Sequence, residues 1–72
     1  MKTDGTLSIH VNGEPRQVAD GLSVAALALE LGLNPARVAV ERNLEIVPRS
    51  TLGEVAVEDG DRFEIVTFVG GG

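Results

Sequence analysis

The sequence contains no cysteine, and its only histidine is His10. Without a thiol, the chain cannot form a disulfide, a thiolate metal site, a redox pair or a persulfide of its own. Basic residues are also scarce, because six Lys and Arg residues stand against eleven Asp and Glu residues and leave a net charge of −5. A field of this sign repels nucleic-acid phosphates and anionic membrane surfaces, so neither is an expected partner.

Long apolar runs are absent as well. The longest, Val24–Leu29, is far shorter than the roughly 20 residues that a membrane helix needs, and residues 1–15 hold no signal-peptide core. We therefore expect a soluble cytoplasmic protein. With 72 residues, 43% of them hydrophobic, the chain is predicted to fold as one domain over residues 1–72, too small to enclose a deep active site.

The first part of the chain predicts a β-hairpin. Residues 1–5 are polar and unpatterned and are expected to form a frayed end, whereas apolar and polar residues alternate from Leu7 to Val11, as in a half-buried strand. Asn12-Gly13 is a strong signal for a two-residue hairpin turn. A second strand over Glu14–Ala19 follows, and Pro15 indicates that it lies at an edge of the sheet.

A helix is predicted between Ser23 and Gly32. Ser23 is suited to cap the first turn with its hydroxyl, Gly32 can adopt the left-handed conformation that ends a helix, and Pro35 prevents continuation. Apolar residues recur at helical spacing, which predicts one buried face, and they are Val24, Leu27, Ala28 and Leu31.

Strand patterns occupy most of the second half. Val38 and Val40 indicate a third strand, Asn43 a turn and Ile46-Val47 a short fourth strand, while residues 50–56 read as a loop or a single helical turn. A final strand is expected over Arg62–Val69 after the Asp59-Gly60 turn. This order predicts an α+β fold of the ubiquitin-like β-grasp type, with a mixed sheet of four to five strands and one long helix packed on one face.

The end of the chain is its least ordinary feature. Glycines 70–72 follow directly on the predicted last strand, although three glycines add nothing to a core. An extended segment over residues 69–72 would project its end roughly 13 Å from the body. We therefore predict that the Gly72 carboxylate is the reactive group, and that Gly70 and Gly71 form a flexible tail that enters partner active sites.

The last strand also predicts a docking surface. Alternation places Phe63, Ile65 and Thr67 inward and Val66 and Phe68 on the face that a single helix leaves open. The predicted docking residues on and beside this face are Val66, Phe68, Val69, Arg62 and Glu64, with Arg42 as a further polar neighbour.

No side chain is predicted to be catalytic. His10 lies on the outward side of the first strand and has no second metal ligand or nucleophile nearby in the pattern. Asp59-Gly60-Asp61 lacks the twelve-position spacing of a calcium loop, and Ser23, Ser50 and Thr51 have no base to activate them. We therefore expect a protein co-substrate that is not an enzyme, with no metal site.

Three segments of this sequence resemble the ThiS family of ubiquitin-like sulfur carriers in thiamine biosynthesis. They are Val11-Asn12-Gly13-Glu14, Glu41-Arg42-Asn43 with Ile46-Val47-Pro48-Arg49, and Asp59-Gly60-Asp61 leading into Phe68-Val69-Gly70-Gly71-Gly72. The resemblance covers about residues 7–72. The family usually ends in two glycines, so Gly70 adds a third.

The resemblance implies partners that perform the chemistry. A ubiquitin-activating-type, ThiF-like adenylyltransferase would use ATP and magnesium to join the Gly72 carboxylate to AMP. A persulfide donor such as a cysteine desulfurase would then supply sulfur for a thiocarboxylate at Gly72, and a ThiG-like thiazole synthase would consume it. The carrier itself would bind no cofactor and would be monomeric.

Two alternatives share the predicted fold. The small subunit of molybdopterin synthase carries the same thiocarboxylate chemistry but is similar only in the tail and general layout. A β-grasp module that binds nucleotide or RNA shares the Asn-Gly and Asp-Gly-Asp turns, yet it normally continues into further domains. A ubiquitin-type tag is disfavoured because Lys2 is the only lysine.

Overall fold

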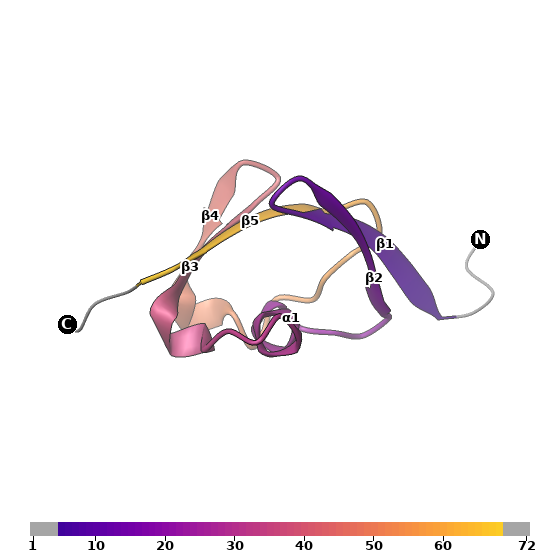
Figure 1. The fold of residues 1–72 in the computed structure, drawn as a ribbon. Helices are drawn as coiled ribbons and strands as arrows, with labels where there is room; N and C mark the ends of the chain where they lie inside the picture. The colour runs from indigo at the N-terminus through magenta and orange to yellow at the C-terminus, as the bar shows by residue number, and fades with distance from the viewer. Residues whose placement is uncertain (1–4, 69–72) are drawn as a thin grey trace.

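The computed structural model describes residues 5–68, and its five strands form one mixed sheet in the order β2-β1-β5-β3-β4 (Figure 1). Only the pairing of β1 with β5 is parallel, and the other three pairs are antiparallel. The elements are β1 (Thr6–Val11), β2 (Glu14–Ala19), α1 (Val24–Glu30), β3 (Val38–Arg42), β4 (Glu45–Val47) and β5 (Arg62–Thr67), with 3-10 helices η1 (Pro35–Arg37) and η2 (Arg49–Thr51). This topology confirms the predicted β-grasp fold.

The β1–β2 hairpin forms as the sequence predicts. Val11 pairs with Glu14 across a two-residue turn, and Asn12 (φ 52°) and Gly13 (φ 86°) both adopt the left-handed conformation. β2 lies at one edge of the sheet. Gly5, predicted to belong to the frayed end, is hydrogen-bonded, because its carbonyl accepts a bond of 2.7 Å from the backbone N–H of Asp20. Residues 1–4 lie outside the described part.

Both ends of α1 are capped as predicted. The Ser23 hydroxyl accepts a 3.0 Å hydrogen bond from the Ala26 N–H. Gly32 (φ 80°) ends the helix in a Schellman arrangement, in which the Leu33 N–H donates to the Ala28 carbonyl at 2.9 Å. The helix spans seven residues. It is longer than η1 and η2, which have three residues each, but short for the long helix that was predicted.

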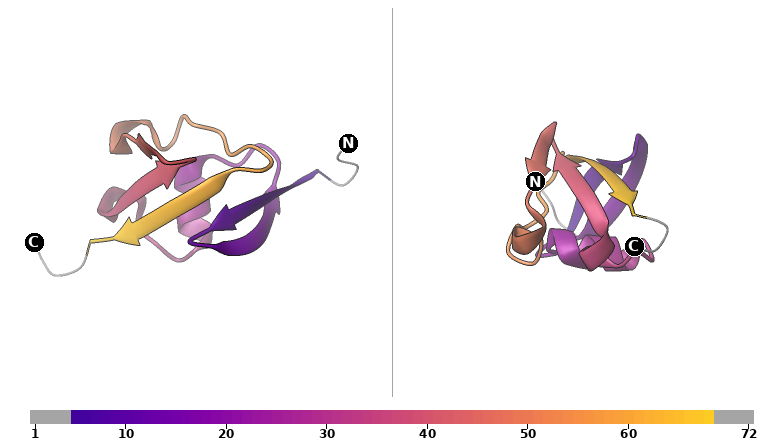
Figure 2. Two further views of the ribbon diagram at one scale, coloured as in Figure 1. Left: turned by 90° about the horizontal axis from the view of Figure 1, so that it is seen from above. Right: turned by 90° about the vertical axis from the view of Figure 1, so that its left-hand side faces the viewer.

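α1 lies against one face of the sheet (Figure 2), and one hydrophobic core lies between the helix and the strands. Leu31 is half-buried, whereas the other three residues of the predicted helix face are buried. The segment over residues 50–56, predicted as a loop or a single helical turn, contributes Leu52 to the core, and Val57 follows it; each is 3% exposed. The buried apolar residues are Leu7, Ile9, Val11, Val18, Val24, Leu27, Ala28, Val38, Val40, Leu52, Val57, Phe63 and Ile65.

The last strand ends earlier than predicted. β5 stops at Thr67, and Val69 lies outside the described residues. Phe63 and Ile65 are buried as expected, but Thr67 is exposed, which corrects its predicted inward position. Thr67 is the final residue of the strand, and its hydroxyl donates to the Arg37 carbonyl at 3.3 Å instead of packing in the core.

Candidate functional site

The open face of the sheet carries an exposed apolar groove. β3 lies between β4 and β5, and its register aligns Glu41 with Ile46 on one side and Ala39 with Val66 on the other. These side chains share the face opposite α1 because strand residues alternate between faces. The groove encloses about 530 Å³ and is lined by Ala39, Val40, Glu41, Leu44, Ile46, Glu64 and Val66. We call this surface the outer groove.

Three large apolar side chains of the outer groove lie in solvent. Leu44 is 89% exposed, Ile46 77% and Val66 59%. Large exposed apolar side chains gathered in one place are typical of a surface that another protein covers. The prediction that Val66 lies on the open face is confirmed. The sequence pattern does not predict Leu44 and Ile46 as its neighbours.

Two acidic side chains accompany these apolar residues. Glu41 and Glu64 face each other across the β3–β5 pair and both line the outer groove. Glu64 and Arg62 also line a second, smaller depression beside Leu44. Glu64 thus lines the outer groove and Arg62 only the neighbouring depression, so the rim of the outer groove itself is acidic.

Phe68 marks the point at which the described chain leaves the sheet. Its N–H donates a 2.8 Å hydrogen bond to the Arg37 carbonyl, which holds the backbone beside the start of β3. The Arg49 guanidinium lies 5.2 Å from the centre of the Phe68 ring, within the range of a cation–π interaction. The ring is 47% exposed, so it lies outside the core as predicted. Arg49 of the Val-Pro-Arg segment therefore contacts Phe68, the last described residue before the tail; we call this contact the root of the tail.

The residues of the tail itself, Gly70, Gly71 and Gly72, lie outside the described residues, as does Val69. Their predicted roles remain predictions. The structure describes the sheet up to Phe68, from which this segment continues.

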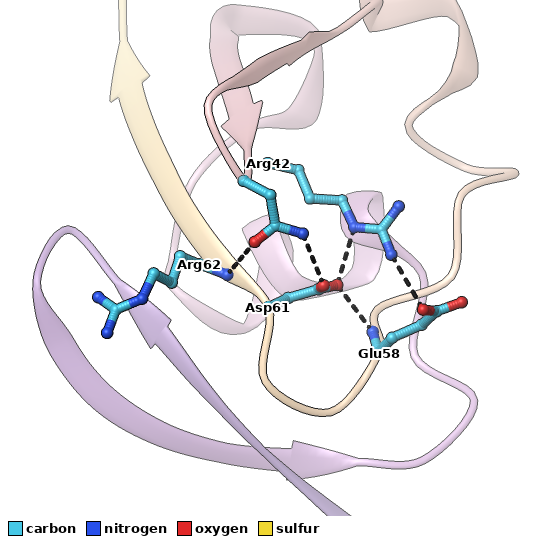
Figure 3. A network of polar contacts seen from close by, with 5 residues as sticks. Arg42, Glu58, Asp61 and Arg62 are labelled. Atoms are coloured by element: carbon cyan, nitrogen blue, oxygen red, sulfur yellow. Dashed lines mark hydrogen bonds and ion pairs between the residues drawn. The ribbon is translucent and has the colours of Figure 1, made fainter.

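At the opposite end of β5, polar groups of four other residues surround the buried side chain of Asp61 (Figure 3). Asp61 is 4% exposed. Its Oδ2 accepts from Arg42 Nε at 2.8 Å and from the Glu58 N–H at 2.9 Å, while its Oδ1 accepts from Asn43 Nδ2 at 3.1 Å. Asn43 Oδ1 in turn accepts from the Arg62 N–H at 3.0 Å. We call these residues the Asp61 cluster.

Arg42 belongs to the Asp61 cluster and not to the docking surface, which corrects its predicted role. It shares the inward side of β3 with Val38 and Val40. There its guanidinium bonds Asp61 and also forms a 3.4 Å ion pair with Glu58. Alternate residues of β3 face inward, and Arg42 is the last of them. Because it lies at the end of the strand, its long side chain can reach the Asp61 carboxylate at the margin of the core.

Asn12 joins β1 to β5 in a similar way. Its side chain accepts from the Ile65 N–H at 2.8 Å and donates to the Ile65 carbonyl at 3.1 Å, so it copies the pairing of a strand residue. The turn residues that carry the family resemblance therefore hold the sheet together.

Other polar groups form no reactive arrangement among residues 5–68. No group of three His, Cys, Asp or Glu residues in this part of the chain could hold a metal ion. His10 is half-buried, whereas the sequence predicted an exposed residue. None of the helices in the described part is long and apolar enough to cross a membrane.

Comparisons with known proteins agree with this geometry. The crystal structure of a thiamine biosynthesis protein (ThiS) from Geobacter metallireducens is similar with a TM-score of 0.76 and 36% identity, over 92% of this chain and 100% of that chain. A computationally designed protein based on human erythrocytic ubiquitin is similar in fold alone, with a TM-score of 0.54 and 18% identity, over 94% of this chain and 96% of that one.

The sequence comparison also finds a longer relative. A thiazole synthase from Paramagnetospirillum magneticum is 53% identical over 66 residues, which make up 92% of this chain. The chain spans only 20% of that protein's length. The ThiS family profile matches residues 9–72, nearly the whole sequence. The chain therefore belongs to the ThiS family.

Proposed function

We propose that this protein is a sulfur carrier for the biosynthesis of the thiamine thiazole, and that its Gly72 carboxylate carries the sulfur. The single observation that carries the proposal is the family match over residues 9–72, which includes the glycine tail. In this role the protein is a co-substrate, and its partners are the enzymes.

The proposed chemistry begins with activation. A carboxylate is a poor electrophile because its leaving group would be oxide, and adenylation provides a better one. The Gly72 carboxylate attacks the α-phosphate of ATP on a ThiF-like adenylyltransferase, and pyrophosphate leaves. A persulfide sulfur then displaces AMP, and a second thiol of the donor cleaves the resulting acyl disulfide to leave a thiocarboxylate.

Thiazole synthase is the proposed acceptor of this sulfur. The relative from Paramagnetospirillum magneticum bears that name, and about one fifth of it, 20%, matches this chain. A carrier domain within the same polypeptide as the enzyme that it serves would have a high effective concentration. This arrangement supports a ThiG-like partner for this chain as well. The persulfide donor, such as a cysteine desulfurase, is proposed from the chemistry alone.

The small subunit of molybdopterin synthase is the alternative with the same chemistry. The match to the ThiS family and to a ThiS structure favours the thiazole pathway. A nucleotide- or RNA-binding role finds less support, because the outer groove is lined by Glu41 and Glu64 and the net charge is −5.

The proposal is tested by incubating the protein with ATP, magnesium and a ThiF-like adenylyltransferase. We expect release of pyrophosphate, followed by the mass increase of one sulfur for one oxygen once a persulfide donor is added. Deletion of Gly72, or one alanine appended after it, should abolish both signals because the reacting carboxylate is displaced. Unchanged pyrophosphate release from the extended chain would contradict the proposal.

A further inference from the structure

Two turns of this chain have the same geometry but different residues. Asn12-Gly13 joins β1 to β2, and Asn43-Leu44 joins β3 to β4, each between directly paired residues. The central φ angles are 52° and 86° in the first turn and 53° and 73° in the second. Both turns therefore have the left-handed pair of residues that defines a type I′ turn, for which Asn-Gly is the preferred sequence.

Leucine is a poor residue for the second position. Its Cβ disfavours the left-handed conformation, which glycine adopts without strain. Burial does not compensate for this strain, because Leu44 is 89% exposed, more than any other large apolar residue in residues 5–68. A glycine or asparagine would serve the fold better at this position. Local strain of this kind is characteristic of functional sites.

We infer that Leu44 is the anchor through which the outer groove binds a partner protein. This inference rests on the proposed function and names a contact that activation requires. The turn lifts Leu44 at the end of the groove, while Ile46 and Val66 form its apolar floor. A partner that accepts the Leu44 side chain removes from water the apolar group that this fold leaves exposed.

Charge decides the kind of partner. Glu41 and Glu64 line the same groove, so the complementary surface is apolar and bordered by lysine or arginine. A second copy of this chain fits poorly, because two copies placed face to face would bring these carboxylates together. Under the proposed function the partner is the adenylyltransferase. Contact at the outer groove would hold β5, which carries Val66 and is followed by Phe68, so that the tail could reach the active site of the adenylyltransferase.

The test compares the wild-type protein with Leu44→Gly. We expect an equal or higher melting temperature, since glycine relieves the turn. The Kd for the adenylyltransferase without ATP should rise roughly tenfold to a hundredfold, as the loss of a buried leucine side chain predicts. KM for pyrophosphate release should rise with it and kcat should stay unchanged, because the tail is intact.

Two further variants control the comparison. Leu29→Ala removes a leucine that is 63% exposed on α1, away from the outer groove, and should leave Kd unchanged. Leu44→Asn keeps a residue that tolerates the left-handed conformation and should weaken binding as Leu44→Gly does.

The outcomes separate this inference from the proposed function. An unchanged Kd for Leu44→Gly with normal pyrophosphate release by the wild type overturns the anchor and leaves the carrier role standing. Binding that depends on Leu44 without any pyrophosphate release supports the anchor and contradicts the carrier role. A wild-type dimer that Leu44→Gly dissociates, or a melting temperature lowered as much as by Ile65→Ala, also overturns the inference.

Discussion

β5 joins two regions that differ in almost every physical respect. Before its first residue lies Asp61, 4% exposed, whose carboxylate accepts three hydrogen bonds of 2.8 to 3.1 Å. Along its outer face lies the outer groove, in which Leu44 is 89% exposed. The Asp61 cluster is satisfied within the chain, while the outer groove leaves apolar surface uncovered. The first arrangement holds one fold together, and the second needs another molecule to complete it.

Several residues of the family motifs form hydrogen bonds that hold the fold together. Asn12, Arg42, Asn43 and Asp61 all belong to segments that carry the resemblance, and each bonds another part of the sheet or its loops. These motifs identify the family because they specify its fold. The outer groove also takes Glu41 and Ile46 from these segments, but it combines them with Leu44 and Val66, and this grouping depends on where the sheet places the four residues. The two regions should therefore respond differently to substitution.

The largest expected effect is on stability at the Asp61 cluster. Asp61→Ala removes the acceptor of Arg42 Nε, Asn43 Nδ2 and the Glu58 N–H, and should lower the free energy of unfolding by about 3 kcal/mol. Urea unfolding measures the loss. In Glu54→Ala, an exposed carboxylate is removed and the change should stay within about 0.5 kcal/mol.

The same variant also tests the separation of the two regions. Under conditions in which Asp61→Ala is still folded, its Kd for the adenylyltransferase should match that of the wild type. A markedly weaker complex of the folded protein would show that the Asp61 cluster takes part in binding and that the two regions do not act separately.

A smaller effect, on binding alone, is expected at the outer groove. Val66→Asp places a third carboxylate beside Glu41 and Glu64 and removes apolar contact area. The affinity for the adenylyltransferase should fall by about 2 kcal/mol, as for truncation of a central interface residue. Calorimetric titration measures this loss. Leu29→Asp adds the same charge on α1 and should bind normally; equal losses in both variants would point to net charge instead of a specific surface.

The smallest effect is expected at the root of the tail. Arg49→Ala removes the cation that lies 5.2 Å from the centre of the Phe68 ring, an interaction worth about 0.5–1 kcal/mol at an exposed site. We expect the free energy of unfolding to fall by about this amount, because the contact lies within the free protein, and urea unfolding measures the loss. Arg16→Ala, on the distant edge strand β2, is the matched control. A loss in both variants would indicate a general effect of charge.

Local features of the fold could be predicted from the sequence. The hairpin over β1 and β2, the Ser23 cap and the Gly32 helix end depend on residues close together in the chain, and all three are confirmed. Burial at the end of an element was harder to predict. Thr67 has the inward parity but is exposed because the strand ends there.

The candidate site was only partly predictable. Alternation predicts Val66 and Phe68 on the open face; Val66 lines the outer groove, whereas Phe68 is exposed beside Arg49. Leu44 and Ile46 could not be assigned to the same surface, because their proximity to Val66 depends on β3 lying between β4 and β5. The signal that was available was Leu44 itself, a leucine in the turn position that usually holds glycine.

The direction of the strands also matters for handling the protein. β1 runs parallel to β5, and His10 near the end of β1 pairs with Arg62 at the start of β5. The first residue of β1 and the last of β5 consequently lie at opposite ends of the sheet (Figure 2). A fluorophore, a surface tether or an affinity handle attached ahead of Thr6 would therefore stay away from the end at which Phe68 leaves the sheet. With no cysteine in the chain, one introduced there would be the single site for thiol labelling.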